Sequence, residues 1–310
     1  QQKRTFLNNL ALEASEMYWE WGGKYRVMSN LIDYQTNAEK RLNLTKILFE
    51  NGDRALIDTV EATTQLQNVR LQLNQAIIEY YSAGINLGRF MWNQDGLPYF
   101  LSEKTIPDTT SANLLKLESK LLAGIDLNNH PDLRDYELKI EGLNVYKNLK
   151  KQSLLPELNL KANVLSSDTP ALNFFGNNIN ENYKLGVGFK VPLLLREARG
   201  EYRMAELKVR ESVSAFDQKK WEINTKVSAY DLERTRLTQQ IKLLENLIEN
   251  NEKLLENEDL KFKQGESSLF LINSRENNIL ETLQKKFETQ VKYNKTLVKQ
   301  LWAGGILSEI

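Results

Sequence analysis

The sequence predicts a mainly α-helical fold with a small β part, in which one long antiparallel helical hairpin occurs twice. Three observations lead to this fold class. Long stretches carry apolar residues at three- and four-residue steps, which is typical of one face of a helix. Two such stretches fold back at a glycine, and the two copies match when the sequence is shifted by 213 residues. Between the copies, two short segments alternate apolar and polar residues, which is typical of β-strands.

The duplication depends on identical residues that occur in the same order in both copies. The shift requires no gap and aligns Asn37 with Asn250, Glu39 with Glu252, Lys40 with Lys253, Leu42 with Leu255, Phe49 with Phe262, Gly52 with Gly265, Leu56 with Leu269 and Tyr80 with Tyr293. Each copy is a helix, a glycine turn and a returning helix. We therefore expect one elongated body made of two similar halves.

The first hairpin occupies the N-terminal part of the chain. Residues 1–50 favour a helix, and the Gly22-Gly23 pair inside it indicates a bend or a close helix contact. Gly52 supplies the reversal because glycine adopts the left-handed conformation without strain. The returning helix is expected over residues 55–92.

The connecting segment is irregular at first and then helical. Residues 93–111 contain the glycine and prolines of a loop, and a short helix is expected over 114–125. The run Asn128-Asn129-His130-Pro131 ends that helix and begins another over 131–153, with His130 as a capping or loop residue.

The pattern then changes from helical periodicity to strict alternation. Each of the two segments is about ten residues long, the length that a tilted strand needs to cross a bilayer. A soluble amphipathic hairpin is the alternative interpretation. The membrane interpretation is favoured because an isolated two-stranded sheet has open edges and needs partners. The apolar members are Leu158, Leu160, Ala162 and Val164 in the first segment and Leu185, Val187, Phe189 and Val191 in the second.

The second hairpin begins at about Arg196. No glycine or proline occurs between Gly200 and Gly265, so the pattern predicts one helix to about residue 262, roughly 100 Å long at 1.5 Å per residue. Gly265 makes the turn, and the last helix is expected over 268–302. A helix of this length exceeds any compact core and must pack on other long helices.

Composition excludes several function classes. Lysine plus arginine and aspartate plus glutamate are balanced at 41 each, which argues against a nucleic-acid partner. The chain has no cysteine and a single histidine, so neither a thiol nucleophile nor a histidine metal site is expected. No paired carboxylates occupy a recognisable cleft, and we expect no enzyme and no cofactor. No long apolar run or signal peptide is visible, so we expect either a cytoplasmic protein or one whose front end has been removed.

Several short motifs resemble the TolC family of outer-membrane efflux channels. They are Asn129 to Leu133 at a helix start, Ser153-Leu154-Leu155-Pro156 before a strand, Gly188 to Leu194 at a strand exit, Arg199-Gly200-Glu201 in the long helix, and the tip turns Phe49 to Gly52 and Phe262 to Gly265. The resemblance covers nearly the whole chain. It implies a homotrimer with a duplicated protomer, in which long hairpins form an α-barrel and the strands join a shared outer-membrane β-barrel.

The resemblance also implies a division of the chain. Residues 1–92 and 195–303 would be the two periplasmic tunnel hairpins, 93–155 the connector and equatorial helices, 156–194 a strand pair with an external loop, and 304–310 a tail. Family members have an earlier helix and strand pair, so a signal peptide, a first helix and a first strand pair are expected to be absent from this sequence.

The function implied by the resemblance is passive export through the outer membrane and periplasm. The partners would be a periplasmic adaptor, an inner-membrane transporter and outer-membrane lipid. The gate would lie just after each tip glycine, and in family members acidic residues shortly after the second tip glycine line the constriction. This chain has Asp58 and Glu61 after Gly52 but Leu271 and Ser274 after Gly265, which puts an acidic ring in doubt; Arg275 and Glu276 are nearby polar candidates.

Two alternatives to a channel are open at the level of sequence. A structural coiled-coil scaffold would explain the helices but not the paired strands. A periplasmic adaptor also carries helical hairpins, but it would place strand-rich segments around one hairpin, whereas here two hairpins flank one strand pair.

Overall fold

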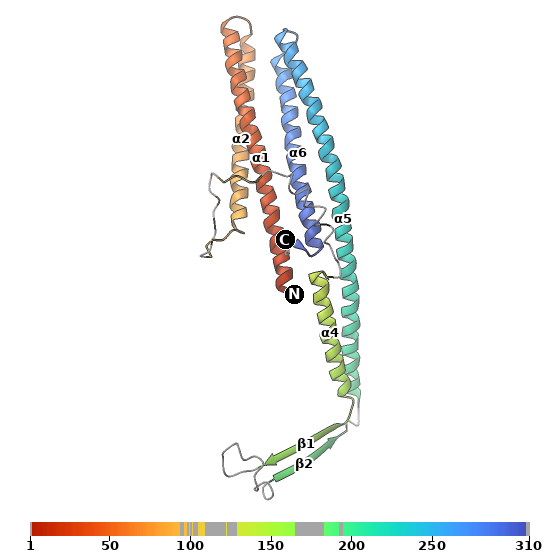
Figure 1. The fold of residues 1–310 in the computed structure, drawn as a ribbon. Coiled ribbons are helices and arrows are strands. Elements are labelled where there is room, and N and C mark those ends of the chain that lie inside the picture. The colour runs from red at the N-terminus through yellow and green to blue at the C-terminus, as the bar shows by residue number, and fades with distance from the viewer. Residues whose placement is uncertain are drawn as a thin grey trace. The chain divides into compact units, whose positions relative to one another are not determined.

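The computed structural model describes residues 2–93, 96, 97, 99, 101, 105–108, 122, 129–164, 183–191 and 195–307. The expected helix over 114–125 and the loop between the strands lie outside the described residues, apart from residue 122. The chain divides into two compact units, residues 1–132 with 222–310 and residues 133–221. Its elements are α1 (Gln2–Glu50), α2 (Leu56–Gly88), α4 (Pro131–Gln152), β1 (Glu157–Val164), β2 (Tyr183–Lys190), α5 (Arg196–Lys263) and α6 (Leu269–Ala303) (Figure 1).

The first unit is built from long helices packed along their length. Helix α1 contacts both α2 and α6, α2 also contacts α6, and α6 is joined to the later part of α5 by ion pairs (Figure 1). The predicted hairpins are therefore α1–α2 and α5–α6, and they lie side by side. This arrangement confirms the mainly α-helical class with duplicated hairpins.

The boundaries of the two hairpins follow the sequence repeat. Helices α1 and α5 end at Glu50 and Lys263, and α2 and α6 begin at Leu56 and Leu269. Each of these pairs is separated by the same 213 residues that separate the tip glycines. Local sequence therefore specifies the whole turn in both copies.

Helix α2 buries a regular stripe against α1. Its buried residues alternate in steps of four and three, with smaller side chains at Ala62, Val69, Ala76 and Ala83 and larger ones at Leu66, Leu73, Tyr80 and Leu87. This is the spacing of knobs-into-holes packing between two helices. We call these eight residues and the α1 residues that they contact the α1–α2 seam. Trp21 of α1 stacks on Tyr80 with ring centroids 6.0 Å apart.

The Gly22-Gly23 pair marks a close helix contact. Helix α1 continues through it without interruption. A Cβ atom placed on Gly23 would lie 2.3 Å from Cγ2 of Val291 in α6, so no larger residue fits there without a shift of the helices. The close contact was one of the two predicted outcomes.

The second unit contains α4, the strand pair and the first part of α5. The ammonium group of Lys150 at the end of α4 donates a 2.9 Å hydrogen bond to Glu201 of α5. Strands β1 and β2 are antiparallel, with Leu158 opposite Phe189 and Leu160 opposite Val187. Each strand has eight residues, slightly fewer than the ten expected, and Val191 follows the end of β2.

Helix α2 is shorter than predicted and ends at Gly88. The chain turns back there, because the N–H of Tyr99 donates to the carbonyl of Met91 over 2.8 Å. A Cβ on Gly88 would lie 3.2 Å from the carbonyl oxygen of Tyr99, so the turn brings two backbones close together.

Helix α4 begins as expected at Pro131. The backbone N–H of Asp132 donates to Nδ1 of His130 over 3.1 Å, so His130 caps the helix. None of the helices in the described part of the chain carries an apolar stretch long enough to span a bilayer.

Candidate functional site at the hairpin tips

The two tip turns have the same backbone geometry. Gly52 and Gly265 both have φ +81°, the left-handed region that glycine adopts without a Cβ penalty. In the first turn the N–H of Asp53 donates to Leu48, five residues earlier, over 2.8 Å, and in the second the N–H of Glu266 donates to Lys261 over 2.9 Å. These bonds satisfy carbonyls that would otherwise be unpaired at the end of a helix.

The first tip holds the second tip through Arg54. Its guanidinium lies 3.8 Å from the centroid of the Phe262 ring and donates a 2.8 Å hydrogen bond to the Phe262 carbonyl. A cation over an aromatic face is attracted by the ring quadrupole, and the hydrogen bond fixes the direction of approach. The contact joins the two hairpins at their ends.

A second link joins α1 to α6 close to the tips. Arg41 and Glu276 form a two-pronged ion pair in which each terminal guanidinium nitrogen donates to one carboxylate oxygen. The Glu276 side chain is only 12% exposed. A planar, partly desolvated pair of this kind is stronger than an exposed ion pair because water screens it less.

Apolar packing lies beside this link. Leu269, the first residue of α6, is fully buried against Ala38, Leu42, Ala62 and Leu66 of the first hairpin. The start of the second hairpin therefore depends on the first hairpin for its core.

Polar groups interrupt the core one turn further along α6. The amide of Gln65 donates a 2.8 Å hydrogen bond to Asn277, and the buried Oδ1 of Asn273 has no hydrogen-bond partner. An unsatisfied buried acceptor costs roughly 1–3 kcal/mol. This cost weakens the interface between the two hairpins near their tips.

The predicted gate residues occupy different environments. Asp58 and Glu61 are half-buried in the first turns of α2, and burial, with the nearby charge of Asp58, raises the pKa of Glu61. Leu271 and Ser274 are exposed. Arg275 lies 3.7 Å from Glu258 of its own hairpin.

Of the predicted residues, Glu276 therefore makes the link between hairpins. The described contacts of Arg275 stay within the second hairpin.

Sequence reasoning missed Arg41 and Arg54, two cations that link the hairpins near their tips. The repeat carried a signal for both. Arg41 aligns with Leu254 and Arg54 with Ser267, so each cation occurs in only one copy. A charged residue that is present in one repeat and absent from the other indicates a contact between the two hairpins and not one inside a hairpin.

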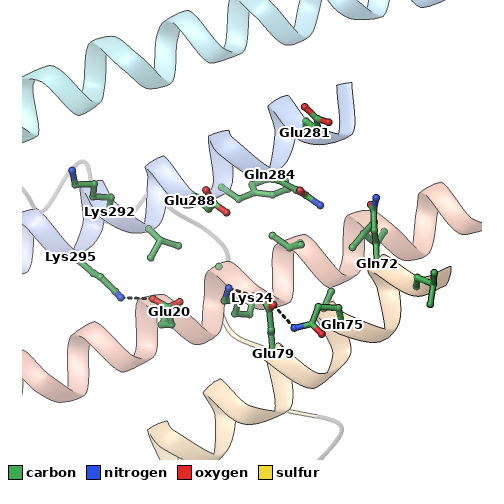
Figure 2. A pocket seen from close by; sticks show the side chains of 17 residues that line it. Glu20, Lys24, Gln72, Gln75, Glu79, Glu281, Gln284, Glu288, Lys292 and Lys295 are labelled. Atoms are coloured by element: carbon green, nitrogen blue, oxygen red, sulfur yellow. Dashed lines mark hydrogen bonds and ion pairs between the residues drawn. The ribbon is translucent and has the colours of Figure 1, made fainter. Parts of the chain in front are cut away.

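A groove of about 840 Å³ lies farther from the tips, between α1, α2 and α6 (Figure 2). Charged side chains from all three helices converge on it. Lys24 donates to Glu79 over 2.8 Å, and Lys295 pairs with Glu20 (Figure 2). Burial alone would lower the pKa of Lys24, but Glu79 and Glu20 raise it. The groove therefore presents paired charges.

Metal binding has no visible basis in this part of the protein. Within the described residues, no group of three or more histidine, aspartate or glutamate side chains is arranged to hold a metal ion.

Comparison with known proteins identifies the architecture. A search of curated sequences found no significant match. Three solved structures are similar over nearly the whole chain. A membrane protein from Pseudomonas aeruginosa has a TM-score of 0.73 at 14% identity, covering 97% of this chain and 67% of its own. VceC from Vibrio cholerae, an outer membrane protein, has a TM-score of 0.71 at 13% identity, with coverages of 96% and 70%. The open-state MtrE outer membrane channel of Neisseria gonorrhoeae has a TM-score of 0.71 at 14% identity, with coverages of 98% and 67%.

The family model described as outer membrane efflux protein matches residues 123–297, which is more than half of the chain. The matched range contains the helix start at Pro131, both strands, the long helix and the second tip. These are most of the features on which the resemblance to TolC-like channels was based; the first tip turn, Phe49 to Gly52, lies outside the match. The chain belongs to the outer membrane efflux protein family.

Proposed function

We propose that this chain is the outer-membrane channel component of a tripartite efflux or secretion system. In this role three copies form a tunnel, and solutes pass through it without chemical change. The main observation behind the proposal is that two hairpins of the same design lie side by side in one chain. The chain also belongs to an efflux protein family. One copy leaves apolar side chains exposed along its long helices. A hollow assembly of several copies is the arrangement that buries them.

The strand pair supports a membrane location for residues 156–194. Leu158, Leu160, Val187 and Phe189 lie on one face of the two-stranded sheet and are all more than two-thirds exposed. The opposite face carries Lys161 across from Gly186. A strand pair that is apolar on one side and polar on the other suits a closed β-barrel with lipid outside and water inside, in which strands from other copies remove the open edges.

The same division gives each segment a role. Residues 1–92 and 195–303 form the periplasmic tunnel, 93–155 an equatorial collar, and 156–194 the membrane end, so most of the chain lies in the periplasm. An adaptor protein that meets the tips would find exposed apolar side chains there. Ile57 and Phe270 occupy the same repeat position and are each 67% exposed. Cargo and energy would come through an inner-membrane transporter.

Gating in this proposal depends on the link between the hairpins. The Arg41–Glu276 pair and the Arg54–Phe262 contact hold the second hairpin against the first. If the second hairpin swings away to open the tip, both contacts must break. The unsatisfied Asn273 lowers the cost of that step because it gains a water molecule on opening.

The experiment combines location with conductance. We expect the full-length protein to fractionate with the outer membrane, to migrate as a trimer that heating dissociates, and to conduct weakly in planar bilayers. Arg41→Ala and Glu276→Ala should each raise the open fraction several-fold, since removing an ion pair of about 1–3 kcal/mol shifts a two-state equilibrium by that order or more. The charge-swapped double variant Arg41→Glu with Glu276→Arg should restore the low conductance.

Lys253→Ala is the matched control. Lys253 forms an exposed pair with Glu249 one turn away in the same helix, so its loss should leave conductance unchanged. A protein recovered only as a water-soluble dimer would reject the channel. Equal effects of the control and of Arg41→Ala would reject the gate.

A further inference from the structure

The two faces of the strand pair differ in charge as well as in polarity. In an antiparallel pair, residues directly opposite each other share a face, and successive residues of one strand alternate between faces. The register therefore gives one face that has no apolar side chain, and we call it the polar face. It consists of Glu157, Asn159, Lys161 and Asn163 of β1 with Lys184, Gly186, Gly188 and Lys190 of β2. Three lysines and one glutamate leave a surplus of two positive charges on this face in each copy.

Only one of the three lysines has a carboxylate partner in the part of the chain that the structure describes. Lys190 lies opposite Glu157, and its ammonium nitrogen is 3.9 Å from a carboxylate oxygen of that residue. Lys161 and Lys184 are exposed and form no ion pair with any described residue. The positive surplus of the polar face therefore comes from these two side chains.

The register places the two unpaired lysines near each other. Lys161 is opposite Gly186 and Lys184 is opposite Asn163, so the lysines are diagonal neighbours across the strand pair. Diagonal neighbours on one face have Cβ atoms roughly 7–8 Å apart. This separation is shorter than the screening length of about 10 Å at 0.1 M salt, so the fields of the two ammonium groups add. Glu157 is farther away, four residues along β1 from Lys161, or about 13 Å.

Glycines leave the polar face open beside these lysines. Gly186 lies opposite Lys161, and Gly188 lies opposite Asn159. A Cβ atom placed on Gly186 would be 3.9 Å from Cβ of Lys161, which is an ordinary van der Waals contact. Packing within the strand pair therefore does not require glycine at this position. Its effect is that no side chain covers the backbone next to Lys161, so solutes can approach the ammonium group.

In the proposed channel the polar face lines the aqueous lumen, because the apolar face meets lipid. Three copies related by symmetry then repeat each lysine as a ring. Rings of lysine or arginine side chains are a means by which pores favour anions. We propose that Lys161 and Lys184 form a charge filter that favours anionic solutes, such as those with phosphate, sulfonate or carboxylate groups, where the channel crosses the membrane. This inference rests on the proposed function, since the polar face must line the lumen.

The absence of cysteine from the sequence allows a single thiol to report the charge beside the two lysines. Asn163 lies opposite Lys184 and two residues from Lys161 on the same face, so Asn163→Cys is the reporter. The full-length channel in outer membranes is treated with two methanethiosulfonate reagents, one with a sulfonate group and one with a trimethylammonium group. Each rate is divided by the rate of the same reagent with a small thiol in solution.

The normalised rate of the sulfonate reagent should exceed that of the trimethylammonium reagent at least about fivefold, because two positive charges at roughly 7–8 Å attract one reagent and repel the other. When Lys161→Gln and Lys184→Gln are added to the reporter, this ratio should fall at least about threefold. A ratio that does not fall would show that the lysines set no preference, contrary to the inference.

The matched control removes two charges from the same face without changing the surplus. Glu157→Gln with Lys190→Gln deletes the existing ion pair, and glutamine is close in size to both side chains that it replaces. The ratio of the two rates should stay within about twofold of the reporter alone, because opposite charges close together largely cancel at a distance. An equal fall in the control would overturn the assignment to Lys161 and Lys184.

Ion selectivity in planar bilayers gives a second readout. The reversal potential in a gradient of potassium chloride yields the permeability ratio of chloride to potassium. Lys161→Glu with Lys184→Glu should lower this ratio at least about threefold at 0.1 M salt, and by much less at 1 M, where the screening length is about 3 Å. The comparison is between variants, so charges elsewhere in the lumen do not affect it. An unchanged ratio at low salt would contradict the filter.

The variant Ala162→Cys separates this inference from the proposed function. Ala162 is the neighbour of Asn163 in β1 and belongs to the apolar face, so in a membrane-embedded barrel neither water-soluble reagent should modify it. If Ala162→Cys reacts as fast as Asn163→Cys, the strand pair does not cross a membrane, and the filter fails together with the proposed function. If only Asn163→Cys reacts, and without preference for the sulfonate reagent, the filter is wrong and the channel stands.

Discussion

The two hairpins of this chain share one backbone plan but are held together by different chemistry. In the first hairpin, the α1–α2 seam is apolar and aromatic. The equivalent positions of α6 are Arg275, Ile279, Thr282, Lys286, Thr289, Tyr293, Thr296 and Gln300. Here α6 is joined to α5 by Arg275 with Glu258, Lys286 with Glu245, and Gln300 with Asp231. We call these α6 residues and their α5 partners the α5–α6 seam.

This difference indicates which hairpin can move. Separating an apolar seam exposes hydrocarbon to water, at about 25 cal/mol for each Å². Separating a polar seam exchanges protein partners for water partners at a small net cost. The buried threonines fit this pattern, since Thr282 and Thr289 donate to carbonyls of their own helix and need nothing from α5. The first hairpin is therefore the more rigid of the two, and the helices of the second hairpin can change their spacing at a lower cost.

The largest expected effect comes from cutting the apolar seam. Leu73 is buried between α1 and α6, and Leu73→Ala should lower the stability of the first hairpin by about 2–5 kcal/mol through lost burial and a cavity. The repeat-equivalent change, Lys286→Ala, should cost the second hairpin less than about 1 kcal/mol, because it removes one partly exposed ion pair. Native-state hydrogen exchange of the α2 and α6 amides measures both values. Equal losses in the two variants would mean that the seams do not differ.

A smaller effect is expected from making the polar seam apolar. Lys286→Leu places in α6 the residue that α2 has at the equivalent position. The side chain is only 23% exposed, so the leucine should be buried and should stabilise the second hairpin by about 1–2 kcal/mol. The amides of α6 should exchange more slowly, and channel conductance should fall. Faster exchange in this variant would show that the Glu245 ion pair matters more than burial.

The sequence predicted the parts of this fold that each repeat specifies by itself. The tip turns and the helix ends beside them follow from Gly52 and Gly265 and from the periodicity around them, and the structure agrees in both copies. Contacts between repeats could not be predicted in this way. Leu56 and Leu269 are the same residue at the same repeat position, yet one is exposed and the other fully buried, because burial depends on a neighbour outside the repeat.

The same reason explains the predicted gate. The prediction considered polar residues just after the tip glycines and therefore included Glu276. It did not include Arg41, which lies on another helix 235 residues away in the sequence. No local pattern around Arg41 distinguishes it from the other cations on exposed helix faces. Only its alignment with Leu254 in the other repeat sets it apart.

The smallest expected effect concerns pH and the α5–α6 seam. Hydrogen bonds from Arg234 and then from Gln300 lower the pKa of Asp231. A carboxylate with a lowered pKa stabilises the folded state above its ordinary value of 3.8 and loses that contribution as the pH falls through the lowered value. Acid should therefore loosen the base of the second hairpin. The first hairpin loses its own ion pairs in acid, Lys24 with Glu79 and Arg70 with Glu39, but keeps its apolar seam. The variant Asp231→Asn should remove this part of the pH dependence.

We expect an effect of a few tenths of a kcal/mol on the free energy of unfolding, because exposed ion pairs are weak. Thermal unfolding followed at pH 7 and pH 3 should show a smaller acid-induced loss in the variant than in the unmodified chain; an unchanged loss would assign the acid sensitivity to other carboxylates.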